Sequence, residues 1–238
     1  MIKDGLIQLE EINGIPVQVS IIQTNGKPNV RTLKPMTPKG ITLHNTGNTA
    51  PSAGALAHGQ YLQNLENRSE VYKSWHITVS HDRIVQHLPL NEQGHHAGDG
   101  ERGPGNTSTI GIEIAENKDY PKAERNAIRL IVALKRHFGF DESAIKPHRF
   151  YSHSEKLCPR RILLSENTWQ KDWERFLENR IRPALDYYDS IESVPDWGKK
   201  TVAKLVAKGY LMGDGNSLRL TKDMIRIFVI HDRAGLYD

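Results

Sequence analysis

The residues with the clearest chemical potential lie in one segment, His148-Arg-Phe-Tyr-Ser-His-Ser-Glu-Lys-Leu-Cys-Pro. This segment holds the single cysteine of the chain, Cys158, together with two histidines and a lysine. One cysteine cannot form an intrachain disulfide, so packing, catalysis and metal binding remain as its uses. Thiolate and imidazole ligands suit zinc, and a catalytic zinc site needs three protein ligands and an open position for water. The segment supplies Cys158 and either His148 or His153, so the third ligand must lie elsewhere.

A candidate for the third ligand follows a short apolar run near residue 40. The sequence Gly40-Ile-Thr-Leu-His-Asn-Thr-Gly predicts a strand that ends at His44, because β-branched residues are followed at once by a polar turn. A histidine at the end of a strand is held by the sheet, while the adjoining loop leaves room for a substrate. We therefore expect His44 to complete the ligand set, the alternative being an ordinary strand-end histidine.

An acidic residue stands inside another apolar run. The sequence Thr109-Ile-Gly-Ile-Glu-Ile-Ala predicts a buried strand that contains Glu113. A carboxylate within such a strand is costly unless it is paired or faces a site. Glu113 is therefore a candidate functional carboxylate. Glu116 lies beyond the apolar run and is expected to face solvent.

The rest of the sequence predicts the elements that must position these groups. Strands are expected within residues 7–23, with a turn at Asn13-Gly14, and within residues 74–89, with a turn at His81-Asp-Arg; residues 103–106 are expected to form a further turn. The spacing of apolar residues predicts helices over residues 52–66, 121–138 and 168–187. Strands that alternate with helices imply an α/β fold with a mixed central sheet flanked by helices.

The C-terminal part of the sequence predicts a separate, small all-α module. One helix is expected to end at Gly209, and a second is expected over residues 222–234 with Thr221 as its N-cap. The predicted organisation is therefore a catalytic domain at residues 1–187 and this module at residues 190–238.

Composition narrows the classes of protein that remain. The chain has 238 residues, of which 37% are hydrophobic and 25% charged, as in proteins with a folded core. No apolar run reaches the ~18–20 residues of a membrane span, so we expect no membrane partner. The N-terminus lacks the basic start and apolar stretch of a signal peptide, which predicts synthesis in the cytoplasm. The net charge of +4 suits an anionic polymer. Without a phosphate-binding loop or a basic tail, we expect no nucleic-acid partner.

Five motifs occur in a recognisable order: Ile-Thr-Leu-His44-Asn-Thr-Gly, Ser-Trp-His76, His96-Ala-Gly, Ile-Gly-Ile-Glu113, and His148 followed after nine residues by Cys158-Pro. In this order and spacing, residues 38–165 resemble the type 2 N-acetylmuramoyl-L-alanine amidases, which share their fold with peptidoglycan recognition proteins and phage lysozyme-type amidases. The resemblance implies a zinc ion held by His44, His148 and Cys158, with His153 as a competing ligand. It also implies that Glu113 and Lys156 are catalytic.

The same resemblance implies which residues bind the substrate. His76 and His96 match histidines that line the substrate groove of the family. Trp75 stands where many members have tyrosine, so no phenol can assist catalysis at that position. We expect Trp75 and Asn45 to contact the substrate beside the two histidines.

The function that the resemblance implies is zinc-dependent hydrolysis of the amide bond between N-acetylmuramic acid and L-alanine in bacterial peptidoglycan. In such chemistry zinc activates water, Glu113 can transfer the proton and Lys156 can stabilise the oxyanion. Two alternatives remain. One is a recognition protein that binds peptidoglycan without cutting it, and the other is a hydrolase that uses Cys158 as its nucleophile.

The C-terminal module resembles the surface-layer-homology-like modules found in wall-anchoring proteins and lysin tails. That resemblance implies wall binding, with self-association or docking to the amidase domain as the alternative. An amidase domain with such a tail looks like a phage endolysin, made in the cytoplasm and acting on the cell wall after its release at host-cell lysis. A bacterial or prophage autolysin is the alternative.

Overall fold

The computed structural model describes residues 1–67, 71–154, 156–213 and 217–237. The chain divides into two compact units, Met1–Phe176 and Leu177–Asp238. This division falls inside the helical run predicted at residues 168–187. The predicted domain limits at residues 187 and 190 stay a prediction.

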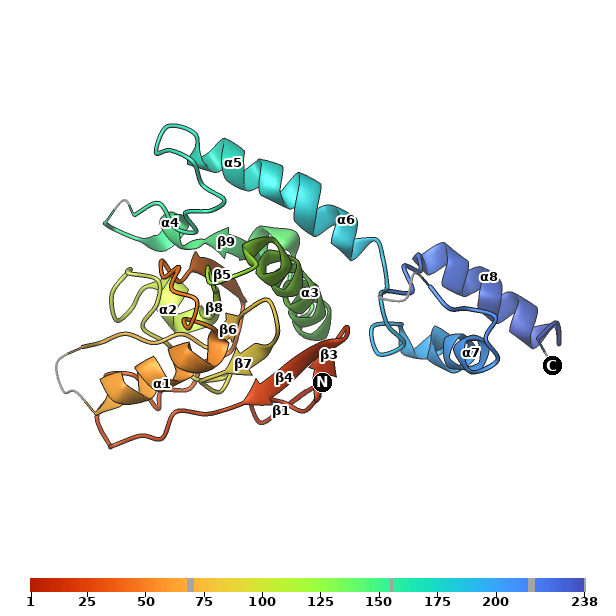
Figure 1. The fold of residues 1–238 in the computed structure, drawn as a ribbon, viewed down its shortest axis with the longest axis horizontal. Coiled ribbons are helices and arrows are strands. Elements are labelled where there is room, and N and C mark those ends of the chain that lie inside the picture. Colours follow the sequence, from red (N-terminus) through yellow and green to blue (C-terminus); the bar gives the residue numbers. More distant parts are fainter. Residues whose placement is uncertain (68–70, 155, 214–216, 238) are drawn as a thin grey trace. The chain divides into compact units, whose positions relative to one another are not determined.

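The first unit is built on a mixed seven-stranded sheet (Figure 1) with the strand order β3-β4-β7-β6-β8-β5-β9. Its strands are β3 (Glu11–Ile12), β4 (Ile15–Val19), β5 (Gly40–Asn45), β6 (Ile77–Val79), β7 (Ile84–Gln86), β8 (Thr109–Ile114) and β9 (Ile145–Pro147). Strand β5 pairs in parallel with β8 and β9, and β8 also pairs in parallel with β6, whereas β6 and β7 are antiparallel. A separate two-stranded sheet joins β1 (Ile2–Lys3) to β2 (Leu6–Ile7).

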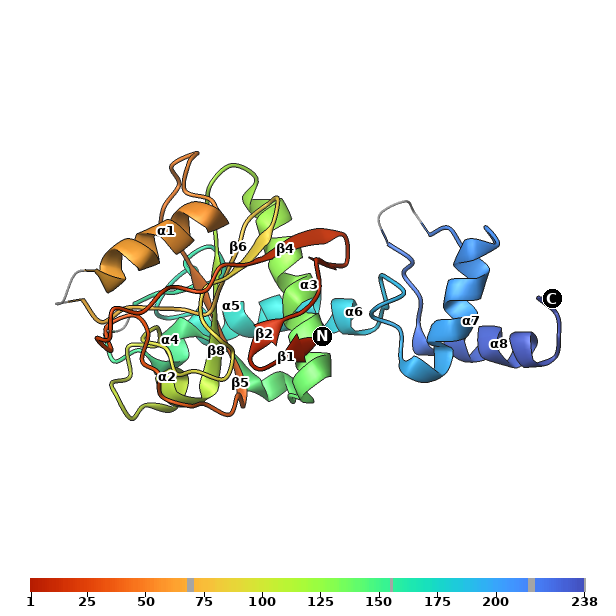
Figure 2. The same ribbon diagram turned by 90° about the horizontal axis from the view of Figure 1, so that it is seen from below.

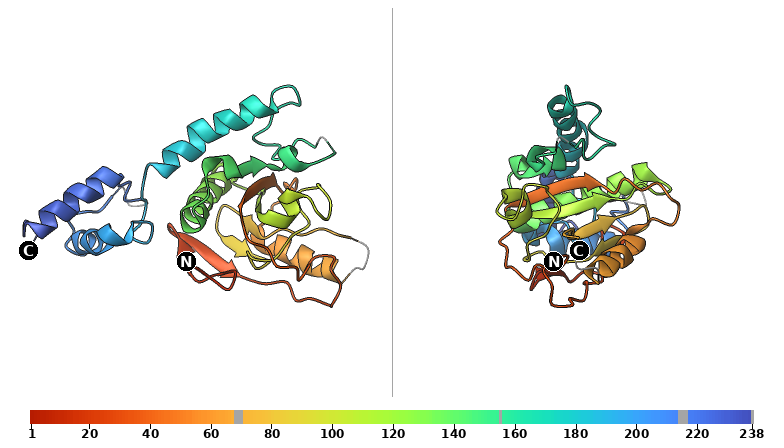
Figure 3. Two further views of the ribbon diagram at one scale, coloured as in Figure 1. Left: turned by 180° about the vertical axis from the view of Figure 1, so that it is seen from behind. Right: turned by 90° about the vertical axis from the view of Figure 1, so that its left-hand side faces the viewer.

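Helices flank the seven-stranded sheet (Figures 2 and 3). The helical elements of this unit are α1 (Ala55–Glu66), α2 (Pro104–Ser108), α3 (Tyr120–Phe138), the 3-10 turn η1 (Glu142–Ala144), α4 (His148–Tyr151) and α5 (Trp169–Phe176). Helix α1 packs against β6 and β7, and α3 packs against β8, β6 and β3. Asp119 caps α3 by accepting a hydrogen bond from the Lys122 N–H, and Gly139 ends the helix at a φ of 72°. The predicted α/β fold with a mixed central sheet flanked by helices is confirmed.

Alternation along the central strands separates a polar face of the sheet from an apolar one. The register places His44 of β5 beside Glu113 of β8, and Glu113 beside Thr78 of β6, so these three residues share one face. The residues that alternate with them are fully buried and apolar: Ile41, Leu43, Ile77, Val79, Ile110, Ile112 and Ile114. Asn45 has the same parity as Leu43 and donates to the Tyr120 hydroxyl in α3. The apolar face is therefore the one that α3 covers.

The turns agree with the sequence prediction at two of three places. Between β3 and β4 the chain turns at Asn13 and Gly14, whose φ values of 51° and 74° suit a two-residue type I′ turn. The β6–β7 hairpin reverses through residues 81–83, as predicted. The turn predicted at residues 103–106 instead begins α2, because Pro104 suits the first turn of a helix, where its missing N–H has no partner to lose.

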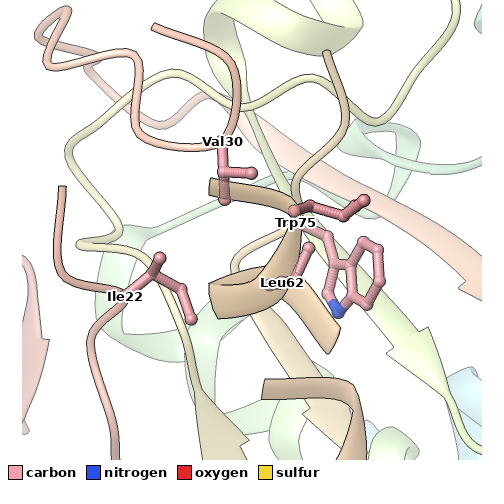
Figure 4. Packing of buried hydrophobic residues seen from close by; sticks show 5 residues of the cluster. Ile22, Val30, Leu62 and Trp75 are labelled. Atoms are coloured by element: carbon pink, nitrogen blue, oxygen red, sulfur yellow. The ribbon is translucent and has the colours of Figure 1, made fainter. Parts of the chain in front are cut away.

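A hydrophobic cluster holds the segment before β6 against α1 (Figure 4). Its members are Ile22, Val30, Leu62, Leu65 and Trp75. Ile22 and Val30 come from the segment after β4, so this segment packs over the helix and the indole. The Trp75 Nε1–H also donates to the Thr78 hydroxyl over 2.7 Å. Trp75 is therefore fixed both by packing and by a hydrogen bond.

Glu116 is buried, contrary to the prediction that it faces solvent. Its side chain is 2% exposed and lies 2.8 Å from the guanidinium of Arg160. It also accepts a hydrogen bond of 2.7 Å from the Gly47 N–H. Burying a carboxylate is favourable only with such partners. Both partners are far from Glu116 in the sequence, which is why the local pattern does not reveal them.

The second unit has a small core of its own. It contains the π-helical turn η2 (Leu177–Ile181) and the helices α6 (Arg182–Leu185), α7 (Asp196–Ala207) and α8 (Lys222–Arg233). Val202 of α7 packs with Ile225 and Val229 of α8. Thr221 caps α8 by accepting a hydrogen bond from the Met224 N–H. The two helices predicted for this part of the chain are confirmed. Within the residues that the structure describes, no helix is both long and apolar enough to cross a membrane.

Candidate metal centre and active site

Three side chains with metal-binding atoms meet at the carboxyl ends of β5 and β9. His44 is the penultimate residue of β5, His148 begins α4 directly after β9, and Cys158 lies in the loop that follows α4. One ligand atom from each residue lies within 4.8 Å of the others, and all three residues are buried. Cys158 Sγ and His44 Nδ1 are 3.9 Å apart. Parallel pairing of β5 with β9 thus brings together groups that are distant in the sequence.

The donor atoms and their spacing fit a zinc ion. Zn–S and Zn–N bonds of ~2.3 and ~2.0 Å at a tetrahedral angle separate the two donors by about 3.5 Å. The distance between Cys158 Sγ and His44 Nδ1 is close to this value, at 3.9 Å. Both ring nitrogens of His148 are buried and have no hydrogen-bond partner among the described residues. Buried polar atoms rarely lack a partner, and a bound metal would supply one here.

His153, the competing histidine, is not part of this group. It is exposed, and the group with metal-binding geometry in the described part of the chain contains His148 instead. Burial and the charge of Lys156 lower the pKa of His148 to about 4. Its imidazole is therefore neutral near pH 7, which is the form that binds a metal.

A chain of hydrogen bonds sets the tautomer of His44. Burial lowers the pKa of His44 and of His96 well below the ordinary histidine value, so both rings are neutral. The Thr109 carbonyl lies 3.2 Å from His96 Nε2 and can only accept, so His96 carries its proton on Nε2. His96 Nδ1 then accepts from His44 Nε2–H over 3.2 Å. His44 therefore keeps a free lone pair on Nδ1, the atom that faces Cys158.

Gly111 makes room for this chain of hydrogen bonds. A Cβ atom at residue 111 would lie 2.7 Å from His96 Cγ, which is too close for two carbon atoms. The Gly111 N–H donates to His76 Nδ1 over 2.9 Å, and His76 Nε2–H donates to the Glu92 carbonyl over 2.8 Å. The ring centroids of His76 and His96 are 5.6 Å apart. The histidines packed around residue 111 thus explain why a glycine stands there, two residues before Glu113.

The family resemblance implied that His76 lines a substrate groove, but the structure does not place it in one. It is fully buried, and both of its ring nitrogens are engaged by the backbone. Its position beside Gly111 supports the strand and the ring of His96. The other three predicted substrate residues, Trp75, Asn45 and His96, do line the cavity around the metal ligands. Asn45 also accepts a hydrogen bond of 2.9 Å from the N–H of Arg161, so its amide helps to hold the loop after Cys158.

Glu113 faces the cavity that contains the three ligand residues. Its Oε2 atom is buried and has no hydrogen-bond partner among the described residues. Burial raises the pKa of Glu113 from 4.5 to about 7, although the charges of Lys73 and Lys156 act in the opposite direction. A carboxyl group with a pKa near neutrality is suited to take up and release a proton during a reaction.

Lys156 and Cys158 determine the remaining electrostatics of the cavity. Lys156 is an exposed residue that lines the cavity, and its charge lowers the pKa of Glu113, His148 and Cys158. Burial outweighs this effect at the sulfur and raises the pKa of the Cys158 thiol to about 12. In the metal-free protein the sulfur is therefore a thiol at neutral pH, and only a bound metal ion would stabilise the thiolate.

Lys73 is a residue of the site that the sequence interpretation missed. It lines the cavity around the metal ligands and also the pocket beside that cavity. An isolated lysine in a segment without regular structure carries no pattern that distinguishes it from the other lysines of the chain. Only the fold shows that it stands beside Trp75 and Glu113.

Comparison with known proteins relates this site to one family. Residues 34–161 match the family model described as N-acetylmuramoyl-L-alanine amidase. Over 136 residues the chain is 48% identical to the N-acetylmuramoyl-L-alanine amidase XlyA of Bacillus subtilis (strain 168), which covers 56% of this chain and 42% of XlyA. Over 130 residues it is 46% identical to the amidase CwlH of the same strain, which covers 54% of this chain and 50% of CwlH.

A solved structure, that of the catalytic domain of XlyA, has a similar fold. It matches with a TM-score of 0.57 and 41% identity, and the match covers 66% of this chain and 99% of that domain. The chain spans about half the length of the two curated relatives it matches.

The ligand set can be tested by metal analysis of single variants. We expect one zinc ion per chain in the wild type and in His153→Ala, and little or none in Cys158→Ser and His148→Ala, because removing one of three ligands weakens a buried site severely. Metal content after dialysis, with circular dichroism to check the fold, measures this. Full zinc retention in Cys158→Ser, or loss in His153→Ala, would contradict the assignment.

The role of His96 can be tested separately from that of the ligands. Phenylalanine has a similar volume but cannot accept a hydrogen bond, so His96→Phe should leave His44 without its partner. We expect zinc affinity to fall by roughly 10–100-fold, the usual effect of losing such an outer partner. Competition with a coloured chelator measures the affinity, and His137→Phe on α3 is the matched control. Equal affinities in the two variants would show that His96 does not position His44.

Proposed function

The chain belongs to the N-acetylmuramoyl-L-alanine amidase family, and we propose that it hydrolyses the amide bond between N-acetylmuramic acid and L-alanine in peptidoglycan, with zinc as its cofactor. The observation that carries this proposal is the cavity in which Glu113 stands beside the ligand group of His44, His148 and Cys158. The names of the relatives XlyA and CwlH support the same bond as the target. The expected setting, a phage endolysin that acts on the wall at host-cell lysis, stays a prediction.

The residues of the cavity have separate roles in the proposed amide hydrolysis. His44, His148 and Cys158 would hold the zinc ion, which when bound lowers the pKa of water and polarises a carbonyl oxygen. Glu113 accepts the proton of the attacking water and returns it to the nitrogen of the departing alanine. Lys156 stabilises the negative charge that develops on the carbonyl oxygen.

A recognition protein that binds peptidoglycan without cutting it is less consistent with this cavity. Binding alone requires neither a complete set of metal ligands nor a buried carboxyl group beside them. The raised pKa of Glu113, about 7, would be an unnecessary cost in a protein that only binds. The combination of ligand set and base therefore favours the hydrolase.

A hydrolase that uses Cys158 as its nucleophile is disfavoured by the surroundings of the sulfur. A nucleophilic cysteine needs a lowered pKa and an accessible thiolate. Cys158 is only 3% exposed, and burial raises the pKa of its thiol to about 12. The environment of this cysteine thus suits a metal ligand better than a nucleophile.

We assign cell-wall binding to residues 190–238, with self-association as the competing role. The aromatic side chains of Trp197 and Tyr210 in this part are 45% and 65% exposed. Exposed aromatic rings are frequent at binding surfaces, because they contribute a large contact area with little loss of conformational freedom.

The proposed reaction can be tested by identifying the chemical groups that it releases. Purified peptidoglycan treated with the zinc-loaded chain should gain free amino groups on L-alanine and no new reducing sugar ends. Removal of zinc with a chelator should stop the release, and added zinc should restore it. New reducing ends would indicate a glycosidase. Activity that resists the chelator would support the alternative of a cysteine hydrolase.

Glu113 should be required for turnover but not for metal binding. We expect Glu113→Gln to keep one zinc ion per chain and to lose roughly 10²–10⁴-fold in kcat, the range for removal of a general base. Because the base acts as the carboxylate and burial raises its pKa, wild-type activity should fall as the pH drops through the pKa of Glu113. The residual activity of Glu113→Gln should lack this decline. A rate near that of the wild type would exclude the assigned role.

Removal of the C-terminal part should affect wall binding more than bond cleavage. All of the proposed catalytic and ligand residues precede residue 159, so a chain that ends at Tyr187 should still hydrolyse a soluble muropeptide at a rate close to that of the full chain. Its sedimentation with intact walls, and its rate on them, should decrease. Unchanged sedimentation would contradict wall binding. Loss of activity on the soluble substrate would show that residues 188–238 contribute to the catalytic fold or to an active oligomer, which sedimentation velocity would detect.

A further inference from the structure

The cavity around the metal ligands adjoins a larger pocket. The cavity has a volume of about 90 Å³ and the pocket one of about 300 Å³, and the two share Thr46, Lys73, Trp75 and Glu113 in their walls. A volume of about 90 Å³ is far below the ~300–1,000 Å³ of pockets that enclose a whole small ligand. The cavity can therefore hold the bond to be cut, and the rest of the substrate must extend beyond it. The shared wall makes the larger pocket a direct continuation.

Lys73 places a supported positive charge in this shared wall. Its Nζ lies 5.7 Å from the ring centroid of Tyr61 and 5.9 Å from that of Trp75, both within cation–π distance. The two rings are stacked with an interplanar angle of 24°, and Trp75 is itself held by the cluster around α1. The Lys73 N–H also donates to the Asn29 carbonyl over 3.1 Å. Both its backbone and its ammonium group are thus held in place.

The ammonium group of Lys73 forms no ion pair with a carboxylate in the described part of the chain, although Glu113 lies in the same pocket wall. Its charge instead acts across the cavity, where it lowers the pKa of Glu113 and of His148. A lysine without an anionic partner in a pocket wall is complementary to an anionic ligand. An anionic ligand bound beside Lys73 would neutralise the positive charge of its ammonium group.

A second pocket beside the cavity lacks this feature. It has a volume of about 620 Å³ and shares His95 with the cavity. The one lysine among its lining residues, Lys34, is paired with Glu101 at 2.5 Å. Its charges are therefore already balanced, and an anionic part of the substrate is better matched by the pocket that contains Lys73.

We propose that Lys73 binds a free carboxylate of the substrate's peptide stem in the pocket beside α1. This inference rests on the proposed amidase function. In the stem, L-alanine is followed by a glutamate that is linked through its γ-carboxyl group, so its α-carboxylate is free unless it has been amidated. This is the first anionic group on the peptide side of the cleaved bond. The pocket would thus select stems that carry isoglutamate over stems that carry isoglutamine.

Two synthetic substrates that differ only in this group test the inference. They are N-acetylmuramoyl-L-alanyl-D-glutamate γ-methylamide and the corresponding D-isoglutamine γ-methylamide, in which the γ-carboxyl group is an amide, as it is in the stem, and only the α-group differs. For the zinc-loaded full chain we expect kcat/KM to be about tenfold higher with the acid, mainly through a lower KM, as a charge-assisted hydrogen bond permits. In Lys73→Gln the ratio of the two values should fall to about one, and Lys73→Arg should keep it above one. Lys122→Gln on α3 removes the same charge outside the pockets and should leave the wild-type ratio unchanged.

The outcomes separate this inference from the proposed function. Equal kcat/KM values for the two substrates in the wild type, or an unchanged ratio in Lys73→Gln, would overturn the role of Lys73 while leaving the amidase function intact. Absence of turnover with both substrates would count against the amidase function itself. Calorimetric binding of the fragments without the sugar, L-alanyl-D-glutamate γ-methylamide and L-alanyl-D-isoglutamine γ-methylamide, then tests Lys73 without turnover. Tighter binding of the acid by the wild type but not by Lys73→Gln would support the inference, and equal binding would contradict it.

Discussion

The register between β5 and β8 sets His44 beside Glu113, and the other features of the site depend on it. Side chains alternate along both strands, so one face supplies the apolar residues that α3 covers and the other supplies the ligand and the base. A shift of one residue would place the imidazole and the carboxylate in the apolar core and would expose isoleucines to the cavity. The same alternation of side chains along β5 and β8 is therefore required both for the apolar core and for the site.

Much of this arrangement could be predicted from the sequence, because its signals are local. The end of a strand at His44, the acid inside the apolar run at Glu113 and the turn at Asn13-Gly14 are each visible within a few residues. The mixed sheet follows from strands that alternate with helices. The order of the five motifs indicated the family, which no single motif would have identified.

What the sequence did not reveal depends on partners that are distant along the chain. Glu116 is buried because Arg160 pairs with it, and His76 is removed from the cavity because Gly111 and Glu92 engage both of its nitrogens. The family resemblance identified His76 as a residue to explain, but only the hydrogen bonds showed what it does. Lys73 gave no signal at all, because its significance comes from the two rings beneath it.

The close approach of Gly111 to His96 has a consequence for how this sequence can vary. Any side chain at residue 111 meets the imidazole ring at 2.7 Å, so the glycine can be replaced only if the ring is replaced or displaced as well. The two positions are therefore expected to show strong epistasis, in which the effect of a double substitution differs from the sum of the single ones. The residue with no functional group is then among the least replaceable in the site, and attempts to alter specificity should begin at other positions.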